Sequence, residues 1–176
     1  MAALLRVAIL GAESSGKSTL AAALAERHGT VWVPEYLREF VETRGRVPVA
    51  GDQFFIARTQ VAREREASAS ARGMLICDTT PLMTVLYSRH YFGGEDTQLA
   101  ALAAGTHYDL TLVTAPDTPW VADGLQRESE AVRQLIYRQL LDELVARRIP
   151  HHILHGTLEQ RLAQTMPLLA PLLADA

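Results

Sequence analysis

The sequence predicts an α/β fold in which a parallel sheet is covered by helices on both faces. Short apolar runs with branched residues alternate along the chain with longer segments of helical periodicity. Parallel strands require helix-length crossovers, so this alternation favours a parallel sheet. With 176 residues, of which 48% are hydrophobic, the chain suits one domain with a full core. We therefore expect residues 1–176 to form a single three-layer domain with a five-stranded sheet.

Five apolar runs are predicted strands. The first run ends at a glycine, as expected of a strand buried on both faces, and the second is stopped by Pro34. The third run delivers Asp78 at its carboxyl end. The predicted strands are residues 4–10, 30–33, 74–77, 108–114 and 152–154.

Seven segments are predicted helices. Gly29 closes the first as a C-terminal cap, and Pro81 fits the first turn of the fourth. The third is long, rich in Ala and Arg, free of Pro and Gly, and expected to be capped by Asp52. The last is predicted in spite of Pro167 and Pro171. The predicted helices are residues 17–28, 35–43, 52–72, 81–91, 97–104, 132–147 and 158–173.

Charge and cysteine content limit the classes of partner. The net charge is −3 and both signs are mixed along the chain, so no basic stripe is predicted that would follow a nucleic-acid backbone. Cys77 is the only cysteine, which excludes an intrachain disulfide and suits a reducing cytoplasm. No apolar stretch approaches the ~20 residues that cross a bilayer. The apolar opening runs into a glycine loop without a cleavage region, so we expect a strand there and not a signal peptide.

The segment Gly11-Ala-Glu-Ser-Ser-Gly-Lys-Ser18 matches G-x-x-x-x-G-K-[ST], a phosphate-binding loop (P-loop). It follows a predicted strand and opens a predicted helix, as this motif requires. Its glycines let backbone N–H groups point inward, and the helix N-terminus adds positive charge where phosphate oxygens lie. Lys17 is expected to reach the β- and γ-phosphates of ATP, and Ser18 to bind Mg²⁺. The residues expected to bind ATP in this loop are Gly11, Ser14, Ser15, Gly16, Lys17, Ser18 and Thr19.

Asp78 is a candidate anchor for the metal. It follows an apolar strand, the position from which P-loop enzymes usually hold Mg²⁺ through water, and we expect it to act together with Ser18. The alternative is that Asp78 caps the following helix jointly with Thr79 and Thr80.

Glu35 is a candidate for the chemistry on the acceptor. A carboxylate after the second strand faces the crevice where an acceptor hydroxyl approaches the γ-phosphate, so it is placed to accept the proton or to orient the hydroxyl. Arg38, one helical turn later, is expected to hold Glu35 or to neutralise the transferring charge. The alternative is an exposed ion pair at the start of a helix.

The connection 115–130 is long and polar and is predicted to be a mobile lid. Arg127 in the lid and Arg133 just after it are expected to stabilise charge on the phosphoryl group, with Arg133 as part of the ATP site. Solvated arginines are the alternative. Tyr36 and Trp120 are the aromatic residues selected as walls for an acceptor base, because one adjoins the catalytic glutamate candidate and the other lies in the lid.

Several motifs together resemble the ribosylnicotinamide kinase domain of NadR-type proteins over nearly the whole chain. They are Gly11 to Ser18, Pro34-Glu-Tyr-Leu-Arg-Glu-Phe40, Gln60, Cys77-Asp-Thr-Thr80, Tyr108-Asp-Leu and Trp120-Val-Ala-Asp-Gly124. The resemblance implies a P-loop kinase fold with strand order 2-3-1-4-5. It also implies transfer of phosphate from ATP to the 5′-hydroxyl of nicotinamide riboside, which gives nicotinamide mononucleotide for NAD salvage. Gln60 and Asp123 are then expected to contact the acceptor.

Two departures from that family affect these expectations. The family commonly has an arginine where Gln126 stands, and Arg127 comes one residue later. Larger members also carry an adenylyltransferase domain and sometimes a DNA-binding segment. Because the first strand begins almost at Met1, we expect this chain to stop at the mononucleotide and not to act in transcription.

Two other functions are compatible with the sequence. The tripeptide Val33-Pro-Glu35 also resembles the deoxynucleoside kinases, so a deoxynucleoside or nucleotide kinase is one alternative. A nucleotide-dependent switch or ATPase that acts through a partner is the other. Activity that depends on a small acceptor would separate the two kinases, for nicotinamide riboside and for deoxynucleosides or nucleotides, from the switch or ATPase. The sequence carries no signal for the oligomeric state.

Overall fold

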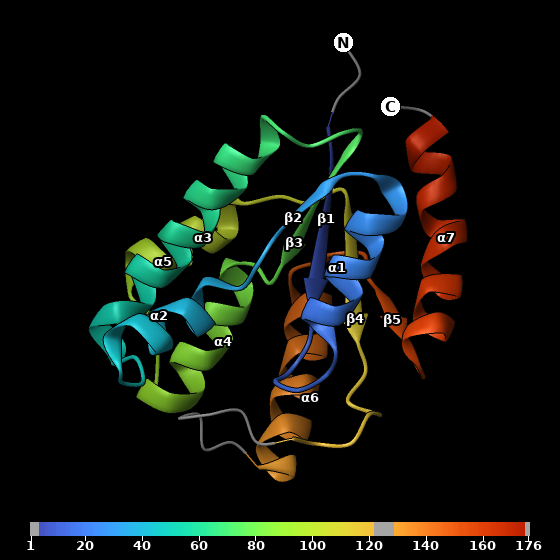
Figure 1. Ribbon diagram of the computed structural model, residues 1–176. Coiled ribbons are helices and arrows are strands. Elements are labelled where there is room, and N and C mark those ends of the chain that lie inside the picture. Colours follow the sequence, from blue (N-terminus) through green and yellow to red (C-terminus); the bar gives the residue numbers. More distant parts are fainter. Residues whose placement is uncertain (1–3, 122–128, 175–176) are drawn as a thin grey trace.

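Five parallel strands form one sheet in the order β2-β3-β1-β4-β5. The computed structural model describes residues 4–121 and 129–174, and its elements are shown in Figure 1. The strands are β1 (Leu5–Leu10), β2 (Val31–Val33), β3 (Met74–Asp78), β4 (Leu110–Thr114) and β5 (His152–Leu154). β1 pairs with β3 and β4 and is therefore central. The predicted five-stranded parallel sheet and its strand order are confirmed.

Helices cover both faces of this sheet, which makes three layers (Figure 1). The helices are α1 (Lys17–His28), α2 (Tyr36–Arg44), the short 3₁₀ helix η1 (Ala50–Asp52), α3 (Gln53–Ser68), α4 (Pro81–Phe92), α5 (Thr97–Gly105), α6 (Glu130–Ala146) and α7 (Leu158–Ala174). Alternate residues of a strand point to opposite faces. Val7 and Ile9 accordingly pack in a core with α1 and α7, whereas Leu10 packs with α4 and α6. Within the described parts of the chain, no helix is long and apolar enough to cross a membrane.

The helix predicted over residues 52–72 is shorter in the structure and is not capped as expected. It ends at Ser68, after which the Ala69 and Ser70 N–H groups donate to carbonyls three residues back, at 3.2 and 3.0 Å, in a tighter turn that closes the helix. The carboxylate of Asp52 accepts hydrogen bonds from Arg46 and from the Val49 N–H instead of capping α3. The cap prediction was wrong because Arg46 offers a bidentate partner that a helix N–H cannot match.

α7 runs continuously through Pro167 and Pro171, as predicted. Each proline removes one helical hydrogen bond, so packing has to compensate. Arg161, Thr165 and Leu169 are spaced four residues apart and form the buried face of α7, which lies on α1. The terminal helix is therefore held by tertiary contacts more than by its own propensity.

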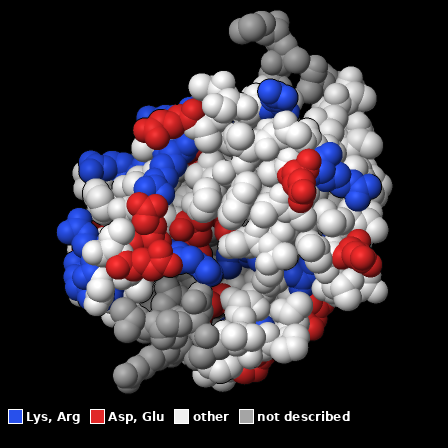
Figure 2. Space-filling view, viewed as in Figure 1, with Lys and Arg blue, Asp and Glu red and all other residues white. Residues whose placement is uncertain are grey.

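The carboxyl ends of the strands all lie at one edge of the sheet, at the lower end of Figure 1. The P-loop joins β1 to α1 there, Glu35 follows β2, Asp78 ends β3, and the segment 115–121 follows β4. On the face shown in Figure 2, acidic and basic side chains are interspersed and no stripe of a single sign crosses it. Parallel α/β sheets bind ligands at this edge, and the P-loop, Glu35 and Asp78 converge on it.

Candidate functional site

Both glycines of the P-loop are required by close contacts. A Cβ on Gly11 would collide with the Thr114 hydroxyl and lie 2.7 Å from Ser15 Oγ. Gly16 has a left-handed φ of 86°, and a Cβ there would lie 2.8 Å from Arg161 Nη1. Ser15 Oγ also shares a 2.7 Å hydrogen bond with Thr114 Oγ1. The loop is therefore packed tightly between the end of β4 and α7.

Lys17 lies at the first position of α1 and its side chain turns back over the loop. Its Nζ donates to the Ala12 carbonyl at 3.0 Å, and the residue is only 8% exposed. A fixed cation at this point of a P-loop is the group that meets the terminal phosphates of a nucleotide. The structure thus places Lys17 where the motif predicts it.

Ser18 and Asp78 are brought together, although 60 residues separate them. The Ser18 hydroxyl donates to Asp78 Oδ2 at 2.5 Å. Asp78 is fully buried, and its Oδ1 has no hydrogen-bond partner among the described residues. Burial raises the pKa of this carboxyl, against the opposing effects of the Lys17 charge, the Ser18 hydrogen bond and Arg38.

These oxygens fit a magnesium ion, which prefers hydroxyl, carboxylate and water oxygens. The buried and unsatisfied Oδ1 of Asp78 is the atom that a hydrated cation would satisfy. The alternative role for Asp78, a helix cap, is not what the structure shows. Thr80 is the N-cap of α4, and no side chain makes a capping hydrogen bond there.

Thr79 has a strained backbone beside this pair. Its φ is 69°, in the left-handed region that a β-branched residue rarely adopts, at a cost of about 1–3 kcal/mol. Its N–H donates to the Ile9 carbonyl at 3.1 Å, and its hydroxyl is buried without a hydrogen-bond partner in the described structure. Thr79 is 6% exposed and lines a cavity next to the P-loop. Backbone strain of this kind is typical of ligand sites.

Two adjoining cavities open at the carboxyl edge of the sheet. The first, of about 700 Å³, is lined by the P-loop together with Glu35, Arg38 and Arg161. The second, of about 440 Å³, is more apolar. Its wall includes Glu35, Gln53, Gln60, Tyr87, Tyr91 and Phe92. Glu35 and Tyr87 line both cavities, so the two spaces share a wall.

Gln60, which the resemblance assigned to the acceptor, lies in the wall of the second cavity. Its Oε1 accepts from the Tyr36 N–H at 2.8 Å, and its Nε2 donates to the Asp78 carbonyl at 3.4 Å. The side chain thereby ties the start of α2 to the end of β3. Gln60 is 2% exposed, so these contacts fix its orientation.

Tyr36 does not reach either cavity, which corrects the prediction that it forms an acceptor wall. Its ring packs edge-on against Phe40 and Phe55, and the Arg63 guanidinium lies over it, 4.6 Å from the centroid. Successive helical residues point about 100° apart, so a neighbour of Glu35 in sequence faces another direction. The aromatic residues at the second cavity are instead Tyr87, Tyr91 and Phe92.

The predicted lid residues are only partly described. Asp123 and Arg127 lie outside the described residues, so their assignments stay predictions. Trp120 is half-buried and is not among the residues that line the two cavities. Its indole N–H is buried and has no hydrogen-bond partner within residues 4–121 and 129–174.

Arg133 is buried against the P-loop instead of pointing into the first cavity. Its guanidinium donates to the Ser14 carbonyl at 3.0 Å and to the Thr118 carbonyl at 2.8 Å, and it forms an ion pair with Glu130. The residue is 2% exposed. Its guanidinium therefore contacts the loop backbone, and the direct contact with ATP stays a prediction.

Arg161 was missed by the sequence analysis. It is also 2% exposed and donates to the Ser15 carbonyl, to the Ala115 carbonyl at 2.9 Å and to Asp117 Oδ1 at 2.7 Å. Burial alone would raise the pKa of Asp117. The Gly156 N–H and the Arg161 side chain outweigh that effect and lower it. The one sequence signal was a charged residue at four-residue spacing from Thr165 and Leu169, on the side of the helix that is buried.

Comparison with known proteins agrees with this architecture. Residues 6–161 match the family described as AAA domain. The trifunctional NAD biosynthesis/regulator proteins NadR of Salmonella typhimurium (strain LT2) and Escherichia coli (strain K12) are each 31% identical to this chain over 147 residues. The match covers 79% of this chain and 35% of each relative, so the chain spans about a third of their length.

Solved structures show the same fold. A NadR protein in complex with NR has a TM-score of 0.76 at 23% identity, covering 87% of this chain and 46% of that protein. A thymidylate kinase from Ehrlichia chaffeensis has a TM-score of 0.65 at 15% identity, covering 94% of this chain and 98% of that one. A deoxyadenosine kinase from M. mycoides has a TM-score of 0.61 at 14% identity, with coverage of 94% and 99%. The chain belongs to the AAA domain family, and over most of its length it is similar to one region of the NadR proteins.

Proposed function

We propose that this chain is an ATP-dependent kinase that phosphorylates the 5′-hydroxyl of nicotinamide riboside to give nicotinamide mononucleotide. The observation that carries the proposal is the shared wall of the two cavities. One cavity is built from the P-loop, the other from apolar and aromatic side chains, and Glu35 borders both. A NadR relative that covers most of this chain was solved in complex with NR, and another with NAD and AMP-PNP.

The first cavity suits the triphosphate of ATP. The N–H groups of the P-loop and the N-terminus of α1 favour negative charge, and Lys17 adds a fixed cation. Ser18 and Asp78 would hold Mg²⁺, which when bound neutralises charge on the phosphates. Both groups are in place before any ligand arrives, which lowers the cost of organising the site.

The second cavity suits a nucleoside with a flat, positively charged base. The rings of Tyr87 and Tyr91 are stacked, with centroids 6.3 Å apart and planes 13° apart. The pyridinium of nicotinamide riboside is a cation, and a cation over an aromatic face gains about 0.5–2 kcal/mol. Gln53, Gln60 and Thr79 place polar groups in the same wall, where a ribose or a carboxamide needs hydrogen bonds.

Glu35 is placed to act on the acceptor hydroxyl. It is the N-cap residue of α2, and its side chain makes no capping hydrogen bond to that helix. Because it borders both cavities, a hydroxyl presented from the second cavity toward the first passes this carboxylate. In the proposed reaction Glu35 orients that hydroxyl and accepts its proton while the γ-phosphoryl group moves to the oxygen.

The test compares acceptors at saturating ATP and Mg²⁺. We expect kcat/KM for nicotinamide riboside to exceed that for uridine, thymidine and deoxycytidine by about tenfold or more, in line with the cation–π gain. A better rate with a neutral nucleoside would contradict the acceptor and favour a deoxynucleoside kinase, a function supported by the near full-length likeness to the deoxyadenosine kinase fold. Slow ATP turnover that no acceptor changes would favour an ATPase switch.

A further inference from the structure

Two buried arginines from opposite faces of the sheet hold successive carbonyl groups of the P-loop. Arg133 comes from α6 and donates to the Ser14 carbonyl at 3.0 Å. Arg161 comes from α7 and donates to the Ser15 carbonyl. Figure 1 shows α6 and α7 on the two sides of the sheet, so the loop is held from both. We propose that Arg133 and Arg161 are positioning residues that preset the P-loop for phosphate binding.

Peptide geometry connects these contacts to the ligand. In a planar trans peptide the C=O of one residue and the N–H of the next point in opposite directions. A guanidinium that holds the Ser14 carbonyl therefore directs the Ser15 N–H to the other side of the loop. In the same way Arg161 directs the Gly16 N–H. Each arginine thus fixes the direction of a different donor in the phosphate-binding loop.

The two arginines have the same kinds of further partner, a backbone carbonyl and a carboxylate. Each guanidinium also donates to a carbonyl just after β4: Arg133 to Thr118 at 2.8 Å and Arg161 to Ala115 at 2.9 Å. Each pairs with a carboxylate that is closer to solvent. Arg133 pairs with Glu130 at 2.6 Å, and Arg161 pairs with Asp117 at 2.7 Å.

Such ties hold the guanidinium groups in one orientation, and both side chains are 3% exposed. A buried, planar guanidinium keeps its hydrogen bonds at defined angles, which a lysine cannot reproduce.

The backbone of the loop needs this support. Ser14 has a left-handed φ of 54°, which costs free energy for a residue other than glycine. Its carbonyl also accepts from Thr118 Oγ1 at 3.3 Å, and its hydroxyl accepts from the Val121 N–H at 3.2 Å. The segment after β4 and the two arginines together hold a conformation that the isolated loop would leave.

The experiment measures phosphate binding without catalysis. Binding of ATP and of inorganic tripolyphosphate is measured by calorimetry for R133A, R161A, R133K and R161K. Arg138→Ala, an exposed arginine of α6, removes the same charge away from the loop and serves as the control. We expect each alanine variant to raise Kd for both ligands about tenfold or more, the lysine variants to recover only part of it, and R138A to match the wild type.

A second readout assigns each arginine to its own peptide. Amide spectra of protein labelled with ¹⁵N-serine and ¹⁵N-glycine are recorded with and without tripolyphosphate. R133A should abolish the ligand-induced shift of the Ser15 amide, and R161A that of Gly16. The proposal would be overturned if R133A and R161A lowered only the melting temperature and kept the wild-type Kd and amide shifts. An equal loss of ligand affinity in R138A would also overturn it. The inference rests on the proposed use of ATP, and its readout is ligand binding. A protein that binds ATP but does not phosphorylate nicotinamide riboside would therefore contradict only the proposed acceptor.

Discussion

Asp78 lies at the proposed metal site, and burial of its carboxylate there costs folding free energy. It is fully buried, Ser18 bonds one of its oxygens, and the other has no partner within the described structure. Burial raises the pKa of its carboxyl above the value in the unfolded chain, more than Lys17 and Ser18 lower it. A raised pKa in the folded state means a contribution to stability that is complete below the unfolded pKa and is lost as pH rises through the folded pKa. The ionised form at neutral pH is therefore destabilising until a cation binds.

Replacing Asp78 with Asn should separate these two effects. Without Mg²⁺ and nucleotide at pH 7, the variant should melt at or above the temperature of the wild type. This difference should shrink as pH falls through the raised folded pKa of Asp78 and should be gone below the unfolded pKa, about 4. The Mg²⁺ concentration for half-maximal rate should rise, because a neutral amide holds the hydrated ion less well. Thermal melts at a series of pH values test the expected stability, and Mg²⁺ titrations of the rate test the metal site. Asp142→Asn, on the surface, is the control for both measurements. An unchanged Mg²⁺ titration would remove Asp78 from the metal site.

Glu35 is the residue whose effect should appear mainly in the transition state. Glu35→Gln keeps the size of the side chain but cannot take up a proton, so kcat should fall about 100-fold or more. Kd for ATP should stay within about twofold, because this interaction forms as the reaction proceeds. Steady-state kinetics and ATP titrations test this. A large loss of ATP affinity with kcat preserved would assign Glu35 to the nucleotide site.

At the scale of elements, what could be predicted from the sequence depends on whether the signal is local. The P-loop from Gly11 to Ser18 is one continuous motif, and the strands are apolar runs, so both were predicted close to their observed positions. Arg161 lies 146 residues from the Ser15 carbonyl that it holds, and no local pattern marks that contact. The prediction for Tyr36 relied on a local signal, its position next to Glu35. That signal misled, because neighbouring residues of a helix point in different directions.

The aromatic wall formed by α4 gives a prediction at this scale. Tyr91→Leu should raise KM for nicotinamide riboside about tenfold while KM for ATP changes little, because the ring borders the second cavity and is not among the residues that line the first. Tyr36→Leu is the matched control: its ring packs on Phe40 and under Arg63, so the variant should lose stability and keep KM. Steady-state kinetics and thermal melts on both variants distinguish the two walls. A larger KM effect in the Tyr36 variant would restore the original assignment.

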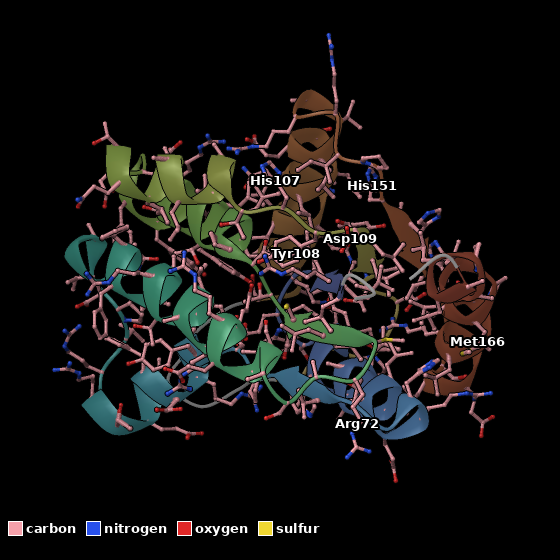
Figure 3. All side chains as sticks on the ribbon, turned by 90° about the horizontal axis from the view of Figure 1, so that it is seen from above. Arg72, His107, Tyr108, Asp109, His151 and Met166 are labelled. Carbon is pink, nitrogen blue, oxygen red and sulfur yellow. The ribbon has the colours of Figure 1, made fainter. Side chains whose placement is uncertain are left out.

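Across the whole molecule, polar groups at the two ends of the sheet serve different purposes. The carboxyl end holds the P-loop and the cavities, with strained and unsatisfied groups such as Thr79. The amino end, viewed in Figure 3 with Tyr108 and Asp109 labelled, holds a polar cluster whose side chains bond to one another. Glu64 of α3 accepts from the Tyr108 hydroxyl at 3.0 Å and pairs with Arg6 of β1. This cluster joins α3, β1 and the start of β4.

Because that cluster lies at the end of the sheet away from the cavities, its loss should change stability and leave the site intact. Glu64→Ala leaves the half-buried Tyr108 without an acceptor for its hydroxyl and Arg6 without its carboxylate, which should lower the free energy of unfolding by about 1–3 kcal/mol. Urea denaturation measures this, with the exposed Glu66→Ala on the same helix as the control, expected within about 0.5 kcal/mol of the wild type. KM for ATP and for nicotinamide riboside should be unchanged at temperatures where the variant is folded. A shift in either KM would show that the two ends of the sheet are coupled, and an equal loss of stability in both variants would show that the buried cluster contributes no more than a surface charge.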